Sequence, residues 1–213
     1  MDSNKNDTQL FEGTGQKKTS RRKFIRQSIG CTAGLTLLAF PGIITDVLAA
    51  KGDKSKEEIH KELEEKVMKY MQTYGTCSQS SFCSLNEQFS LKGDNTIRAL
   101  KSFAGGIAGN GETCGAVTGS LLALGLFFEP KDPAMNEKSL DAMKYAASFF
   151  NKFKEEFGST RCSEVVEHQY GRKYDFQNPE DMKLFMEAAK SGKCGEVVTK
   201  AVLTAADIIL ENS

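Results

Sequence analysis

Apolar side chains recur every three or four residues along most of the chain after residue 55, which is the spacing of amphipathic helices. The first such segment opens with Ser55 and Glu58 in a capping-box pattern and stops before Gly75, so we predict a helix over 56–73. No segment shows the sustained alternation of polar and apolar residues that indicates a strand. We therefore predict an all-α fold, built as a single compact domain of seven or eight helices.

The other predicted helices begin and end at local signals. Asn178 followed by Pro179 is a strong start signal, and Gly158 is a typical residue just after a helix end. Asp94 or Asn95 is expected to cap a helix that ends at the glycine pair 105–106. The predicted ranges after the first helix are 77 onward, 94–103, 114–128, 136–157, 162 onward, 178–192 and 194–210.

Four cysteines each lie just after a glycine break, at or near the predicted start of a helix. We call them the site cysteines: Cys77, Cys114, Cys162 and Cys194. Thr113 is the expected N-cap of the helix that begins at Cys114. In this helix Gly115 and Gly119 lie four residues apart, so another backbone or a cofactor can come close to that side. The pattern predicts one site assembled from four helix N-termini.

The first fifty residues resemble an export signal. The pair Arg21-Arg22 precedes a weakly apolar run, which is the order of a twin-arginine signal, and Ala49-Ala50 offers a cleavage site. We predict that 1–50 is a signal region, that 51–213 is the helical four-cysteine domain in the periplasm, and that it meets the membrane only during export. Removal of 1–50 takes away 7 of 28 basic and 4 of 28 acidic residues, and the remaining net charge of −3 gives no indication of nucleic-acid binding.

Four thiolates in one place repel one another, so the site has three possible chemical forms. Metal ligation satisfies all the charges, and thiolates select iron–sulfur clusters, zinc or Cu(I). The spacings of 37, 48 and 32 residues match no zinc-finger or ferredoxin pattern, and no CxxC is present. Disulfide pairing suits an exported protein, although five cysteines remain after cleavage and at least one stays free. The third form has protonated thiols with one reactive member. The residues alone leave all three open.

The segment 114–119, CGAVTG, fits the pattern CGAxxG. With TCSQS at 76–80 upstream, and with Cys162 and Cys194 downstream, it resembles the redox-active C_GCAxxG_C_C family over residues 58–210. This resemblance implies that the site cysteines are the functional thiols. Some relatives of the family are similar to split-Soret cytochromes, which add CxxCH haem sites. This chain has no CxxCH, so we expect no c-type haem.

The expected function is that of an exported redox-active protein. In it, the site cysteines would hold an iron–sulfur cluster or another metal for electron transfer or redox sensing. One alternative is a thiol–disulfide oxidoreductase with Cys114 as the attacking thiol. The other is a disulfide-stabilised binding or structural domain. The sequence does not identify the redox partner, and whether the protein is an enzyme stays open.

The other cysteines and the histidines are not expected in the site. Cys31 lies close behind the arginine pair of the signal, and Ser28 stands where a lipoprotein motif needs an aliphatic residue. Cys83 is six residues beyond Cys77, about 240° further round a helix, and is expected to be a small buried residue. His168 is expected at the surface or in the core, and His60 in solvent. Two histidines exclude a histidine-rich metal site.

Overall fold

The computed structural model describes residues 54–129 and 139–213, and these form a single all-α domain. The predicted fold class is confirmed. The predicted export signal and cleavage site within 1–50 lie outside the described residues, as do residues 136–138 of one predicted helix. No helix in the described part of the chain is both long enough and apolar enough to cross a membrane.

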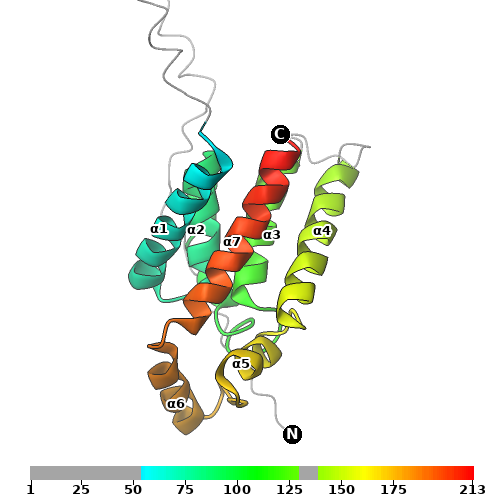
Figure 1. Cartoon of the computed structure of the whole chain (residues 1–213). Helices are drawn as coiled ribbons and strands as arrows, with labels where there is room; N and C mark the ends of the chain where they lie inside the picture. Colours follow the sequence, from blue (N-terminus) through cyan, green and yellow to red (C-terminus); the bar gives the residue numbers. More distant parts are fainter. Residues whose placement is uncertain (1–53, 130–138) are drawn as a thin grey trace, which may run out of the picture. The chain divides into compact units, whose positions relative to one another are not determined.

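Seven α-helices follow one another along the described residues, and Figure 1 shows their arrangement. They are α1 (Lys56–Tyr74), α2 (Cys77–Phe89), α3 (Gly115–Phe128), α4 (Ser139–Phe157), α5 (Cys162–Tyr170), α6 (Pro179–Ala189) and α7 (Lys193–Glu211). Two short 3₁₀ segments, η2 (Asp94–Thr96) and η3 (Ala99–Phe103), lie between α2 and α3.

Helix α7 lies at the centre of the domain. It packs against α1, α2, α3, α4 and α5, and its buried residues recur at helical spacing from Val197 to Ile209. Figure 1 shows that α2, α3 and α7 all begin at the end of the bundle where α5 lies. The fold therefore gathers four helix N-termini at one end of the domain.

The predicted caps explain where several helices begin and end. Ser55 and Glu58 form the predicted capping box at the start of α1, and Gly75 ends that helix in the left-handed conformation at φ 64°. The Asn178 side chain accepts hydrogen bonds from Glu180 N–H and Asp181 N–H at the start of α6. Side-chain caps of this kind typically contribute about 1 kcal/mol each, because they satisfy donors that the helix leaves unpaired.

Two predicted elements differ from the structure. The helix expected over 94–103 is instead the pair of 3₁₀ segments, in which backbone N–H groups donate to carbonyls three residues earlier. The helix expected over 178–192 ends at Ala189 as an α-helix. Beyond it, Lys190, Ser191 and Gly192 each donate to the carbonyl three residues earlier, which tightens the chain into a turn before α7.

Candidate functional site: thiols at four helix N-termini

The structure places all four site cysteines at helix starts, as predicted. Cys77 and Cys162 are the first residues of α2 and α5, and Cys194 is the second residue of α7. Cys114 is itself the N-cap of α3, whereas Thr113 was the predicted cap. Thr113 does not serve because it pairs with Arg161 in an isolated antiparallel bridge.

Two glycines of the CGAxxG segment let α2 and α3 approach closely. A Cβ atom on Gly115 would lie 2.9 Å from Ser78 N and 3.2 Å from Cys77 Cβ. A Cβ atom on Gly119 would lie well inside van der Waals contact with the Ser78 carbonyl oxygen and the Ser81 hydroxyl. Only glycine permits this crossing without moving the helices apart, so the motif brings Cys77 next to the start of α3.

A short backbone ladder brings Cys114 next to Cys162. Cys114 N–H donates to the Thr160 carbonyl at 2.8 Å, and Cys162 N–H donates to the Glu112 carbonyl at 2.6 Å. Outside the ladder, the Arg161 guanidinium pairs with the Glu112 carboxylate at 2.9 Å. These contacts join two segments that are about fifty residues apart in sequence, and α3 and α5 both begin where the ladder ends.

The glycine-rich turn before α3 forms a left-handed loop against Cys162. The backbone φ is positive at four glycines and also at Ile107 (60°) and Ala108 (53°), which L-residues adopt only at a cost in free energy. At Gly106, with φ 70°, a Cβ atom would lie 2.6 Å from Cys162 Cβ. The Gln177 side chain holds the loop from outside by donating to the carbonyls of Ala108 and Gly109. The loop thus packs against the Cys162 side chain at its Cβ.

The thiols interact mainly in two pairs, Cys77 with Cys194 and Cys114 with Cys162, and the structure contains no disulfide between the described cysteines. Cys77 and Cys194, both half-buried, are called the outer pair. Their interaction, with burial, raises the pKa of the Cys77 thiol well above its usual range. The interaction with Cys77 lowers the pKa of the Cys194 thiol to about 7. Burial opposes this shift, and the Tyr170 hydroxyl assists it. The outer pair therefore favours a thiolate on Cys194 and a protonated thiol on Cys77.

Cys114 and Cys162 form the inner pair, with only 4% and 8% of their surfaces exposed. The Cys162 thiol lowers the pKa of Cys114, burial opposes this, and the N–H groups of Ala116 and Val117 at the start of α3 assist it. Cys114 and burial raise the pKa of Cys162. Negative charge on either inner sulfur also raises the pKa of Cys77, so the two pairs lie close enough to influence each other.

The expected metal ligands are therefore close together but are arranged as pairs. Among residues 54–129 and 139–213, no three Cys, His, Asp or Glu side chains are placed so that they could hold a metal ion. The described side chains therefore do not form a preformed set of metal ligands, and metal binding by the site cysteines stays a prediction.

Comparison with known proteins agrees with this four-cysteine geometry. The family described as "Putative redox-active protein (C_GCAxxG_C_C)" matches residues 75–208, which is more than half of the chain and contains all four site cysteines. The chain belongs to the C_GCAxxG_C_C family. An uncharacterised protein of Archaeoglobus fulgidus is similar to it, at 29% identity over 133 residues, which cover 59% of this chain and 79% of that protein. No solved structure matches the chain significantly.

Tyr170 is a residue of the site that sequence reasoning missed. The Cys194 N–H donates to the Tyr170 hydroxyl oxygen at 3.1 Å. The Tyr170 ring packs edge-on against Tyr174 and Phe185, which fix its position. Helix α5 therefore carries a site residue at each end, since it begins at Cys162 and ends at Tyr170. The one hint of this role in the sequence is that Tyr170 is the last residue of the helix that begins at Cys162.

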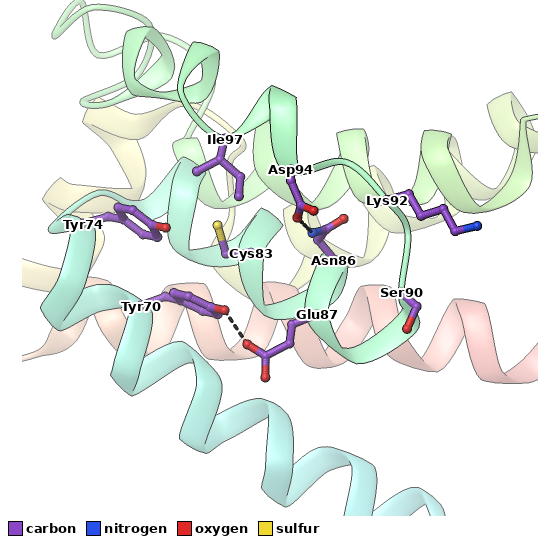
Figure 2. Close-up of a pocket in the computed structure, with 9 residues that line it drawn as sticks. All are labelled: Tyr70, Tyr74, Cys83, Asn86, Glu87, Ser90, Lys92, Asp94 and Ile97. Atoms are coloured by element: carbon purple, nitrogen blue, oxygen red, sulfur yellow. Dashed lines mark hydrogen bonds between the residues drawn. The ribbon is translucent and has the colours of Figure 1, made fainter. Parts of the chain in front are cut away.

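The fifth described cysteine lies elsewhere, as expected. Cys83 is 2% exposed and borders a separate pocket of about 350 Å³ between α1 and α2. Figure 2 shows Tyr74 and Ile97 beside its thiol, and Tyr70 donating to the Glu87 carboxylate. Burial raises the pKa of the Cys83 thiol to about 11, which keeps it protonated and unreactive at neutral pH.

Neither histidine reaches the thiols. His168 is exposed on α5. His60 is half-buried, and its Nε2 lies 2.6 Å from the Asp207 carboxylate of α7. The expectation that His60 is simply solvated was wrong, because α1 packs against α7 and brings the two side chains together.

Proposed function

We propose that this protein is a thiol-based redox protein that uses its four site cysteines as two dithiol/disulfide pairs. The observation that carries the proposal is the grouping of the thiols. All four thiols lie at helix starts at one end of the domain, and within each pair the two thiols interact with each other. The family's description as redox-active supports the same function at a coarser level.

Such a pairing suits disulfide exchange for a simple chemical reason. The thiolate is the nucleophile that attacks a disulfide, and its protonated neighbour then resolves the mixed disulfide after losing its proton. A thiolate near pH 7 combines a useful ionised fraction with good nucleophilicity, and this describes Cys194. Each pair would take up two electrons when its disulfide is reduced to two thiols.

Disulfide mapping tests the proposal. The protein is equilibrated in buffers of defined ratio of reduced to oxidised dithiothreitol, alkylated, and digested for mass spectrometry. We expect Cys77–Cys194 and Cys114–Cys162 disulfides that form and disappear reversibly, while Cys83 stays alkylated throughout. The proposal fails if the site cysteines remain reduced in the most oxidising buffer, or if other pairings dominate.

The same titration separates this function from that of a disulfide-stabilised structural domain. Reduction of a structural disulfide typically costs about 2–5 kcal/mol of stability. Under our proposal both redox forms are folded, because the reduced form already has its packed core. A large loss of the free energy of unfolding upon reduction would favour the structural role.

A metal centre held by the site cysteines is the second candidate. The convergence of four thiols at helix N-termini supports it, since such a set would satisfy the charges of an iron–sulfur cluster or another thiolate-bound metal. The test is metal analysis and visible absorption of protein purified without oxygen. Stoichiometric metal that is lost from each of four single Cys→Ser variants, but retained by Cys83→Ser, would establish the centre and displace the dithiol proposal.

We further propose that the protein is exported to the periplasm by the twin-arginine route. The support is the order of Arg21-Arg22, the apolar run and Ala49-Ala50 in the sequence. An oxidising compartment would suit disulfide chemistry. Replacement of both arginines by lysine should leave the precursor in the cytoplasm, as followed by cell fractionation, and unchanged export would contradict the assignment.

A further inference from the structure

We propose that the two thiol pairs act in series, so that the outer pair exchanges with an external disulfide and then passes the oxidation to the inner pair. This inference rests on the proposed dithiol function and adds an order and a direction to it. It also assigns different roles to four cysteines that the sequence pattern treats alike.

Access from outside distinguishes the pairs. Both members of the outer pair are half-buried, whereas both members of the inner pair are buried. The glycine-rich loop packs against Cys162 Cβ, and the ladder between 111–114 and 160–163 holds the start of α3 against the start of α5. An external disulfide must bring its sulfur into line with the attacking thiolate, so steric access restricts it to the outer pair.

Within the outer pair, the surroundings select Cys194 as the attacking thiol. It lies in the first turn of the 19-residue helix α7, where the helix dipole favours an anion. The Tyr170 hydroxyl uses its oxygen to accept the Cys194 N–H, so its proton remains available to the sulfur of the same residue. Cys77, the other half-buried member of the outer pair, is then the resolving thiol.

The outer pair approaches the inner pair at Cys77. Its Cβ lies only 3.2 Å from the position of a Cβ on Gly115, the residue that directly follows Cys114. The close crossing of α2 and α3 therefore places Cys77, the resolving residue of the outer pair, next to the start of α3, where Cys114 is the N-cap. Since Cys114 is the inner cysteine next to this crossing, it is the nucleophile for the second exchange.

The steps balance without a further reactant. The Cys194 thiolate attacks the external disulfide, one external thiol leaves, and Cys77 displaces the other to form the Cys77–Cys194 disulfide. The Cys114 thiolate then attacks the Cys77 sulfur and releases Cys194 as a thiolate. Cys162 attacks the Cys114 sulfur and releases Cys77. The net change is reduction of one external disulfide to two thiols and oxidation of the inner pair to one disulfide.

A quenched time course tests this order. The full-length chain carries Cys31→Ser and Cys83→Ala, so that only the site cysteines remain, and it is fully reduced. It is mixed with one equivalent of oxidised glutathione, quenched with acid and N-ethylmaleimide, and mapped by mass spectrometry. We expect the Cys77–Cys194 disulfide to appear first and to decline as Cys114–Cys162 accumulates.

Three single replacements in the same background sharpen the result. Cys162→Ser should leave the outer disulfide as the dominant product. Cys77→Ser should retain glutathione on Cys194 and form the inner disulfide at least about tenfold more slowly, because the connecting thiol is gone. Cys194→Ser should slow the inner disulfide similarly, and circular dichroism checks that each variant keeps its helices.

The outcomes separate the inference from the function on which it rests. If the inner disulfide appears before the outer one, or forms as fast in Cys77→Ser and Cys194→Ser as in the parent chain, the serial order is wrong while dithiol chemistry stands. If the parent chain forms neither disulfide under excess oxidised glutathione, the proposed function itself fails.

Discussion

The crossing of α2 and α3 gives a sharp test of how the CGAxxG segment works. The perturbation is Gly119→Ala, and the matched control is Gly125→Ala on the same helix. Both glycines lie inside α3 with negative φ, so neither replacement strains the backbone. A Cβ on Gly125 would meet nothing within 4 Å, whereas one on Gly119 would overlap the backbone of α2.

The magnitudes follow from these surroundings. Gly125→Ala should stabilise the protein by about 0.5–1 kcal/mol, since alanine loses less backbone entropy in a helix than glycine. Gly119→Ala has the same favourable entropy contribution, but its Cβ must displace the Ser78 carbonyl and the Ser81 hydroxyl. Overpacking of this kind typically costs about 1–3 kcal/mol of stability. Displacing Ser81 also disturbs its hydrogen bond to the Cys77 carbonyl at 2.8 Å, a contribution of about 1 kcal/mol. We expect a net loss of roughly 2 kcal/mol.

The assay is urea unfolding followed by circular dichroism, with both variants compared to the parent chain. For a domain of this size, a loss of about 2 kcal/mol corresponds to a fall in melting temperature of roughly 4–8 °C. The control should move in the opposite direction. If Gly119→Ala is as stable as Gly125→Ala, then the close helix crossing does not exist in solution, and the proximity of Cys77 to Cys114 loses its basis.

Two further predictions concern individual side chains. Tyr170→Phe should raise the pKa of the Cys194 thiol, because a hydrogen bond to a charged group is lost. The pH at which alkylation accelerates, expected near 7 in the parent chain, should therefore rise by about 1–2 units. Tyr174→Phe is the control, and an equal rise there would refute the hydroxyl's role. Cys83→Ala should leave the disulfide map unchanged and lower the free energy of unfolding by about 1 kcal/mol, because it leaves a small cavity in the core. A changed disulfide map would instead place Cys83 in the site.

Local chemistry made much of this fold predictable. The capping box at Ser55, the Asn178-Pro179 start and the left-handed Gly75 all act within a few residues, so the sequence contains the whole interaction. The placement of cysteines at helix starts was predictable for the same reason. The 3₁₀ segments were not, because whether a short stretch closes α-helical or 3₁₀ turns depends on how its neighbours hold the two ends.

The pairing of the thiols lies beyond what local patterns determine. It depends on the ladder that joins Thr113 to Arg161 and on the left-handed loop beside Cys162, both of which are long-range arrangements. Tyr170 was missed for a related reason. Its hydroxyl reaches Cys194 only because α5 packs against α7, and no spacing between the two residues encodes that contact.

A comparison among the helix starts links stability to function in this site. The cysteine-free helices α1 and α6 each have a side-chain cap, from Ser55 and Asn178. None of the four helices that begin at the site cysteines has a side-chain hydrogen bond at its N-cap. The absence of such a cap costs about 1 kcal/mol of stability per helix. These four helix starts therefore lack a stabilising contact that α1 and α6 have.

That departure has a physical use at a thiol site. The uncapped N–H groups keep their positive partial charge directed at the nearby sulfur atoms, and this favours a thiolate most where burial removes competing water. Cys114 illustrates the effect, since the N–H groups of Ala116 and Val117 help to lower its pKa despite its burial. A side-chain oxygen placed at such a helix start would satisfy the same N–H groups and compete with the thiolate. The absence of caps at these four helix starts is therefore consistent with a site built to hold negative charge on sulfur.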